Sequence, residues 1–458
     1  MNSHNFFNDV ARRRMFAALV FICTIGGGAD RSVNSQELTA SILLRPHIEN
    51  LNAKHDDITK AIEVFKTGDF IQAKQLLDSV CLADTSLPPS RLLLATMFQA
   101  ANRPVLARAE LENASRESPA DPGAFLIFAE SAIQNGRYSE AEILFDRASQ
   151  LATKVTNNDY RKQNIQDRIA ANSAAIAEAR ELWTEAADLL GPLTAKDPNN
   201  LNLVSRLSRS LFKSGKPNEA MELLKQHWDA NQATTQRPEI TLAVLYQEAN
   251  DLEKAEELMV TASEFDSENA INQIMVTRWA LENGKLKLAK KCIDQAVKTQ
   301  PNLETKLLSA LVARYQEDYG TAKSVLESAH LESPANLGII LELAIALSNI
   351  KGEENRGLQY AQLAAKLQPD LRQSAGRNAA MSLAWLLYRF GGQAEAEKIL
   401  QNVLRAGQIS SESSYFAARI LMNKNRAASK QLFEELIKNG RQFPGFNEAK
   451  TIYKTTIW

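Results

Sequence analysis

Small side chains recur along most of the chain at intervals of 33 to 35 residues, broken once by a step of 45. A first column holds Ala61, Ala95, Ala129, Ala174, Ser208, Ala243, Thr277, Ala310 and Ala344. A second column, 12 or 13 residues later, holds Ala73, Ala107, Ala141, Ala186, Ala220, Ala255, Ala289, Ala322 and Gly357, and continues to Ala396. Large apolar residues follow most of the second column by four positions, which places both on one helical face. Because helices approach closely only where the side chains at their contact are small, the pattern predicts two packed helices per repeat.

A turn is predicted between the two columns, at a position that carries Gly or Asn in most repeats. Its members are Gly68, Asn102, Gly136, Gly215, Asn250, Gly284 and Gly391. These residue types adopt the left-handed backbone conformation that ends a helix. Proline recurs after the second helix, at Pro119, Pro198, Pro301, Pro334 and Pro369. Because proline cannot continue a helix, each repeat is predicted to be a helix, a tight turn and a second helix.

This period and these columns resemble the tetratricopeptide repeat, most clearly in residues 61–77 and 129–148. The resemblance spans residues 54–440, although the tryptophan of the family's first helix is absent and Gly191-Pro192 interrupts one second helix. It implies an all-α fold, a right-handed α-solenoid of about 10–11 helix–turn–helix repeats.

Short segments flank the predicted solenoid of residues 54–440. We expect residues 30–53 to form an N-terminal capping segment and residues 441–458 a C-terminal capping helix, because an unstacked repeat exposes its apolar face. The one long step places an insertion near residues 153–165. We expect this insertion to lengthen two neighbouring helices into a protrusion or to form an exposed loop. It is either a tolerated surface insertion or a contact for a specific partner.

The first 29 residues resemble a secretory signal peptide. Arg12-Arg13-Arg14 precede an uncharged run from Met15 to Ala29. As a helix this run would span about 22 Å, short of the roughly 30 Å of a bilayer core. The basic start, the short apolar run and the small residues at its end are typical of a cleaved signal. We therefore predict export to the periplasm or cell envelope of a bacterium, with no membrane span in the mature chain. An uncleaved membrane anchor is the alternative.

Composition narrows the function further. The formal net charge is −1, from 53 basic and 54 acidic residues, which argues against a protein that coats nucleic acid. The 5 His and 3 Cys show no metal-binding spacing, so we expect no metal and no other cofactor. The chain lacks a phosphate-binding glycine loop followed by Lys and Ser or Thr, and lacks a nucleophile elbow. These observations predict that the protein is not an enzyme.

The concave face of the solenoid is the predicted binding surface, since the first helix of each repeat lines that face in the tetratricopeptide family. The register places there Arg206, Arg209, Phe212, Arg237, Arg278, Arg314, Trp385 and Tyr388. Arginines with interleaved aromatic residues could hold an acidic or extended segment of a protein partner. The alternative is that the arginines pair with nearby glutamates and that the aromatic residues belong to the core.

Together these features predict a non-catalytic protein–protein interaction scaffold in the bacterial cell envelope. Exported proteins of this family accompany secretion, polysaccharide export or outer-membrane assembly, which is an expectation from resemblance alone. The alternative function is a carbohydrate- or peptidoglycan-binding module. It requires Trp385, Tyr388 and Tyr315 to be exposed along one surface.

Overall fold

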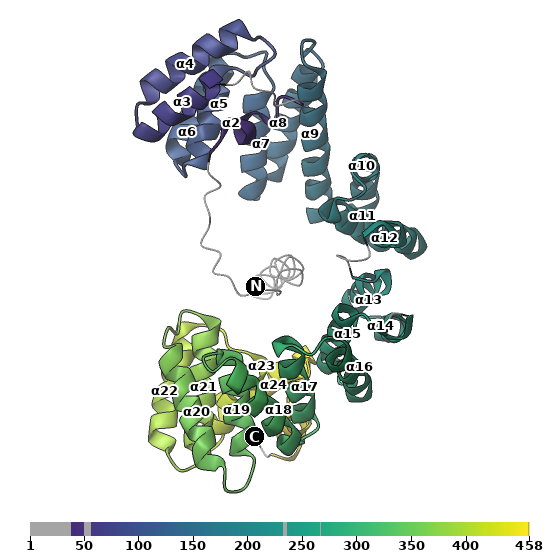
Figure 1. Ribbon diagram of the computed structural model, residues 1–458, viewed down its shortest axis with the longest axis vertical. Helices are drawn as coiled ribbons and strands as arrows, with labels where there is room; N and C mark the ends of the chain where they lie inside the picture. The colour runs from purple at the N-terminus through teal and green to yellow at the C-terminus, as the bar shows by residue number, and fades with distance from the viewer. Residues whose placement is uncertain (1–37, 50–55, 232–235, 266, 457) are drawn as a thin grey trace. The chain divides into compact units, whose positions relative to one another are not determined.

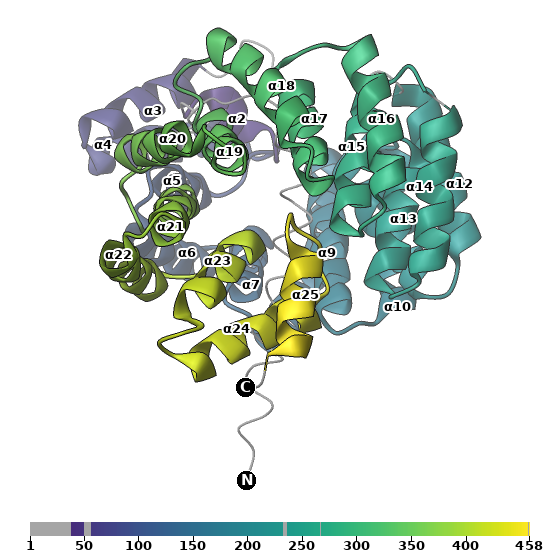
Figure 2. The same ribbon diagram turned by 90° about the horizontal axis from the view of Figure 1, so that it is seen from below.

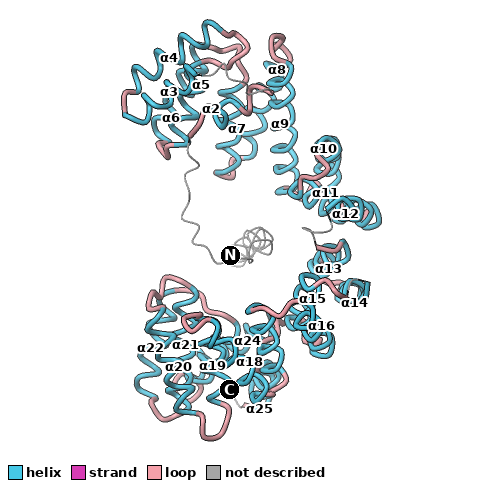
Figure 3. Tube along the Cα trace, in the orientation of Figure 1, coloured by secondary structure: helices cyan, strands magenta, loops and turns pink. Residues whose placement is uncertain are grey.

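The computed structural model describes residues 38–49, 56–231, 236–265, 267–456 and 458 (Figure 1). Within these residues the chain forms 24 helices and no strands (Figure 3). The predicted signal peptide, residues 1–29, lies outside the described part. The chain divides into two compact units, residues 1–196 and 197–458, and we describe each by itself. The all-α solenoid expected from the repeat is confirmed.

The first unit holds four helix–turn–helix repeats preceded by a short helix. Its helices are α2 (Ala40–Leu44), α3 (Asp56–Thr67), α4 (Phe70–Ala83), α5 (Ser90–Ala100), α6 (Pro104–Glu117), α7 (Gly123–Gln134), α8 (Tyr138–Ala152), α9 (Asp159–Ala179) and α10 (Trp183–Lys196). Within each repeat the first helix packs on the second, beginning with α3 on α4 and ending with α9 on α10. Leu43 and Leu44 of α2 are buried in the apolar cluster of the first repeat.

The second unit holds seven repeats and a terminal helix. Its helices are α11 (Leu201–Lys213), α12 (Pro217–Asn231), α13 (Pro238–Glu248), α14 (Leu252–Phe265), α15 (Ala270–Glu282), α16 (Leu286–Thr299), α17 (Leu303–Tyr315), α18 (Tyr319–Glu332), α19 (Leu337–Ser348), α20 (Glu354–Leu367), α21 (Ser374–Arg389), α22 (Gln393–Ala406), α23 (Ser411–Leu421), α24 (Arg426–Asn439) and α25 (Phe446–Thr455). Figure 2 shows α25 beside α24, on which it packs. Phe446 and Ala449 of α25 are buried in the core that α21–α24 share.

The small-residue columns lie where the two helices of a repeat meet. Every member of the first column, from Ala61 to Ala344, has no solvent exposure. Gly357, the one glycine in the second column, has a specific reason to lack a side chain. A Cβ atom there would lie 2.8 Å from the backbone oxygen of Ala344 and 2.8 Å from the backbone nitrogen of Ser348. Helices α19 and α20 therefore approach more closely than alanine permits.

The turns confirm the backbone conformation predicted for the Gly and Asn column. All seven members have positive φ, for example 96° at Gly68 and 62° at Asn250. Glu181, Glu317 and Gly352 adopt the same conformation in three of the four remaining turns, and the α23–α24 turn forms without it. The two glutamates are not a residue type that sequence reasoning assigns to such a position. Repeat geometry therefore dictates the turn even where the residue is unfavourable.

The insertion near residues 153–165 begins with an exposed loop, residues 153–158, which is one of the two forms we expected. Helix α8 keeps an ordinary length of 15 residues, whereas α9 is extended to 21. The start of α9 packs onto the N-terminal segment instead of protruding. Asn158 Nδ2 donates to the backbone oxygens of His47 (2.8 Å) and Ser86 (2.9 Å), and Tyr160 Oη donates to that of Arg45 (3.1 Å). The expectation of a protrusion is wrong because these polar contacts draw the inserted turns across the first unit.

His47 sits beneath this contact. Its side chain is buried beside Arg161 and Arg168, and burial together with these two positive charges lowers the pKa of His47 from 6.5 to about 3. Arg161 is buried as well and pairs with Asp121 at 2.7 Å. The N-terminal segment therefore meets α9 through neutral histidine and a paired arginine.

Candidate functional site

The first helices of successive repeats contact one another in the second unit, from α13 and α15 through to α21 and α23. They form the inner layer of the stack, on which the sequence placed its candidate residues. We use the name inner surface for a set of residues on the first helices α11, α13, α15 and α17. Its members are Arg206, Arg209, Phe212, Tyr246, Glu248, Arg278, Glu282, Glu304 and Tyr315.

Three of the predicted residues lie together on α11. Arg209 pairs with Glu248 of α13 at 2.7 Å, and both side chains stay partly exposed. Phe212 meets Tyr246 of α13 edge to face, with ring centroids 4.8 Å apart. Arg206 lies one helical turn before Arg209 and is half-buried. This part of the inner surface therefore joins cations and aromatic rings on two adjacent first helices.

Arg278 occupies the equivalent layer further along the unit. It projects from α15 and pairs with Glu304 of α17 at 2.8 Å, and the two side chains are 45% and 42% exposed. Like the Arg209 pair, this one links two consecutive first helices. An exposed pair of this kind contributes about 0–1 kcal/mol to stability. Arg278 can therefore exchange Glu304 for another anion at little cost.

Arg237 is enclosed by its own chain. It is buried at the start of α13, where it pairs with Glu239 at 2.8 Å. Its guanidinium lies over the rings of Trp228 and Phe265, at 4.9 and 5.0 Å from their centroids. The negative face of each ring stabilises the cation. Arg237 thus fastens α12, α13 and α14 to one another.

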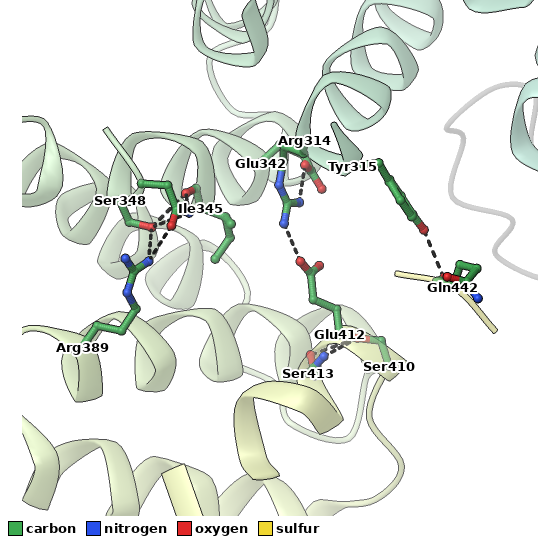
Figure 4. Close-up of polar contacts among 11 residues, drawn as sticks. Arg314, Tyr315, Glu342, Ile345, Ser348, Arg389, Ser410, Glu412, Ser413 and Gln442 are labelled. Carbon is green, nitrogen blue, oxygen red and sulfur yellow. Dashed lines mark hydrogen bonds and ion pairs between the residues drawn. The ribbon is translucent and has the colours of Figure 1, made fainter. Parts of the chain in front are cut away.

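Arg314 is the most enclosed of the candidates, with 2% of its side chain exposed. It bridges Glu342 of α19 at 2.5 Å and Glu412 of α23 (Figure 4). Although burial opposes its charge, these two carboxylates raise the pKa of Arg314. Burial also raises the pKa of Glu412, despite the arginine beside it. The network therefore ties three first helices together.

The aromatic candidates belong to the core of the last repeats. Trp385 is buried, and its ring stacks on Phe416 with centroids 5.1 Å apart and an interplanar angle of 5°. Tyr388 stacks against Trp385 at 6.0 Å and is half-buried. Tyr315 is half-buried and donates a hydrogen bond to the backbone oxygen of Gln442. Trp385 thus offers no open ring face, and the carbohydrate-binding alternative loses its main support.

Sequence reasoning placed all eight candidates on one ligand-binding face, and the structure separates them. Arg206, Arg209, Phe212 and Arg278 remain partly open to solvent, whereas Arg237, Arg314 and Trp385 contact only other parts of the chain in the described residues. The glutamate partners were not identified from sequence. A signal for two of them existed, because Glu248 and Glu304 follow their arginines by 39 and 26 residues, which places each on the first helix of the next repeat.

Two further properties bear on function. In the described ranges no group of three or more His, Cys, Asp or Glu side chains is placed to hold a metal ion. None of the helices described combines the length and the apolar character needed to cross a bilayer.

Comparisons with known proteins agree with the repeat architecture. Two tetratricopeptide repeat family models match residues 92–154 and 178–238. The chain therefore contains tetratricopeptide repeats in these two ranges. It is similar to the cellulose synthase operon protein C of Pseudomonas fluorescens, with 26% identity over 41% of this chain. The match covers 18% of that protein, so the chain corresponds to less than a fifth of its relative.

Solved structures similar to this chain include yeast Tom70, at 16% identity, with 87% of this chain and 94% of that chain covered and a TM-score of 0.38. A thermophilic tetratricopeptide repeat protein of Thermus thermophilus is 16% identical, with 41% and 97% covered and a TM-score of 0.34. Pseudomonas aeruginosa pilF is 18% identical, with 48% and 96% covered and a TM-score of 0.31.

Proposed function

We propose that this protein is a non-catalytic scaffold of the bacterial cell envelope that binds an extended, acidic segment of a protein partner on its inner surface. Tetratricopeptide repeats support protein–protein interaction, and the fold is typically non-catalytic. The observation that carries the proposal is two ion pairs that join successive first helices, the partly buried Arg209–Glu248 and the exposed Arg278–Glu304. An acidic segment lying across them would replace the glutamates as partner of each arginine.

The envelope location and the link to polysaccharide rest on two weaker supports. One is the predicted signal peptide of residues 1–29. In the same proposal, segments 30–53 and 441–458 cap the solenoid of residues 54–440. The other is the relative named for a cellulose synthase operon. We propose a role in an assembly that makes or exports polysaccharide. Mass spectrometry of the chain recovered from the periplasmic fraction tests export, and an N-terminus at Met1 would contradict cleavage.

Affinity capture from an envelope extract of the source organism tests the binding surface. One bait carries Arg209→Glu and Arg278→Glu. The control carries Arg356→Glu on the second helix α20. Arg356 is 45% exposed, like Arg278, and pairs with Glu327 at 3.0 Å and Glu353 at 2.6 Å. A partner bound through the inner surface should be retained by the wild type and the control and reduced at least fivefold on the double variant. Equal retention by all three baits would exclude the inner surface.

A further inference from the structure

The end of the chain returns to the inner surface. We call residues 440–445, which link α24 to α25, the C-terminal strap. The backbone N–H of Gln442 donates to the backbone oxygen of Glu282 at 3.1 Å. Figure 4 shows the second contact, in which Tyr315 Oη donates to the backbone oxygen of Gln442 at 3.1 Å. Arg441 forms an ion pair with the carboxylate of Glu282. These contacts join residues 127 to 160 positions apart, whereas solenoid repeats ordinarily contact only their neighbours.

The strap is held in the manner of an extended peptide ligand. Two of its contacts use its own backbone, and the third uses one cationic side chain. Main-chain hydrogen bonds that give affinity, with side-chain contacts that give specificity, are a recurring way in which proteins bind extended segments. The Gln442 side chain also lies close to the turn after α15, because a Cβ atom at Gly284 would be 3.3 Å from Gln442 Cγ.

The polar contacts of the strap are separable from its apolar anchor. Phe443 is buried, and its ring contacts those of Tyr415 on α23 and Phe446 on α25. Arg441 and the Glu282 side chain are 64% and 43% exposed, so a competing segment can reach this end of the surface. Gly440 and Gly445 bound the strap with φ of 68° and 95°. Residues 441 and 442 can thus leave α15 and α17 without removing Phe443 from the core.

The site under the strap is continuous with the proposed binding surface. Glu282 follows Arg278 by four residues, so both lie on one face of α15. A segment that covers the Arg278–Glu304 pair and continues along α15 arrives at Glu282 and Tyr315. At that end it would meet a carboxylate in place of an arginine.

We propose that the carboxyl ends of α15 and α17 form a binding site for an extended protein segment with a basic residue at this end, and that the strap occupies the site until such a segment displaces it. This inference rests on the proposed function and extends it. The partner then carries acidic residues toward Arg209 and Arg278 and a basic residue at Glu282. The strap itself shows which sequence chemistry the site accepts.

A fluorescein-labelled peptide that copies residues 438–446 is the probe, with binding to the full chain followed by fluorescence anisotropy. Wild-type protein should bind it weakly, because the tethered strap competes. Arg441→Ala, which alters an exposed side chain, should bind the probe about two- to fivefold more tightly, as expected for the loss of one exposed ion pair. Adding Glu282→Arg should abolish this gain, and a probe with Glu in place of Arg441 should restore it. Arg372→Ala, at an arginine with a 90% exposed side chain paired with Asp370, is the matched control.

Gln442→Pro removes the strap's N–H donor and provides a second way to free the site. Circular dichroism verifies that each variant is folded. If neither folded strap variant binds the probe more tightly than the wild type and the control, the strap is only a structural connection and the proposal is overturned. This test needs no natural partner. Failure to capture a partner from envelope extract would count against the proposed function while leaving probe binding intact.

Discussion

Replacing Arg314 by methionine should destabilise the second unit far more than the same change at Arg278. Methionine keeps the apolar length of the side chain but removes the only charge between Glu342 and Glu412. The two carboxylates would then face each other at the centre of three packed helices. At Arg278 the same substitution leaves Glu304 largely in contact with water. The comparison isolates the effect of enclosure, because both arginines link first helices.

The magnitude follows from the exposure of the groups that remain. Breaking a buried ion pair by removing one partner costs about 3–5 kcal/mol, against about 0–1 kcal/mol for an exposed pair. Glu342 and Glu412 keep 22% and 25% of their side-chain surface exposed, so the lower end, about 3 kcal/mol, applies. For a unit of this size that corresponds to a fall in Tm of about 6–12 °C.

Urea titration followed by tryptophan fluorescence measures this difference. The second unit contains Trp228, Trp279, Trp385 and Trp458, four of the 5 tryptophans in the chain. The unfolding midpoint should fall clearly for Arg314→Met and hardly at all for Arg278→Met. Equal midpoints in the two variants would refute the argument that Arg314 holds the unit together from the inside.

Three further predictions concern stability. Neutral His47 stabilises the first unit fully above pH 6.5. Its contribution to the free energy of unfolding should fall by about 1.4 kcal/mol for each pH step of one as the pH drops from 6.5 toward 3. A His47→Gln variant whose stability has the same pH dependence in that range would contradict this prediction. Gly357→Ala should lower the free energy of unfolding by about 1–3 kcal/mol through overpacking. Gly191→Ala, with nothing within 4 Å of its Cβ position, should raise it by about 0.5–1 kcal/mol. Thermal melts that rank the two variants oppositely would disprove the close approach at Gly357. Asn158→Ala removes a helix cap and two hydrogen bonds and should lower the free energy of unfolding by about 2–4 kcal/mol. Asn336→Ala, which removes only a helix cap, should lower it by about 1 kcal/mol. Similar losses for the two variants in chemical denaturation would show that the α9 contact is unimportant.

The repeat architecture was predictable because the same small-residue and turn positions recur in most repeats. Each small residue of the first column is buried, and each Gly or Asn of the turn column has positive φ. Ion pairs between adjacent repeats were also within reach, since their partners are separated by about one period. The pairing of Arg314 with Glu412 across 98 residues was not. It depends on small rotations accumulated over several repeats, which no local pattern encodes.

The residues predicted as a binding site show the same division between what the repeat pattern predicts and what it does not. Helical register correctly assigned Arg209, Arg278 and Trp385 to first helices. It could not distinguish an arginine that faces solvent from one enclosed by a later repeat. The course of the inserted segment was missed for the same reason, because the groups that hold Asn158 lie on a loop and a segment far earlier in the chain.

The strap also sets an order of events during synthesis. Helix α15 is complete at Glu282, but its contacts Arg441 and Gln442 are added about 160 residues later. At 5–20 residues per second this delay is about 10–30 s. The middle repeats must therefore remain folded by local contacts alone until residues 441 and 442 have been made. The synthesis of the strap, and not the folding of any single repeat, permits its contact with α15.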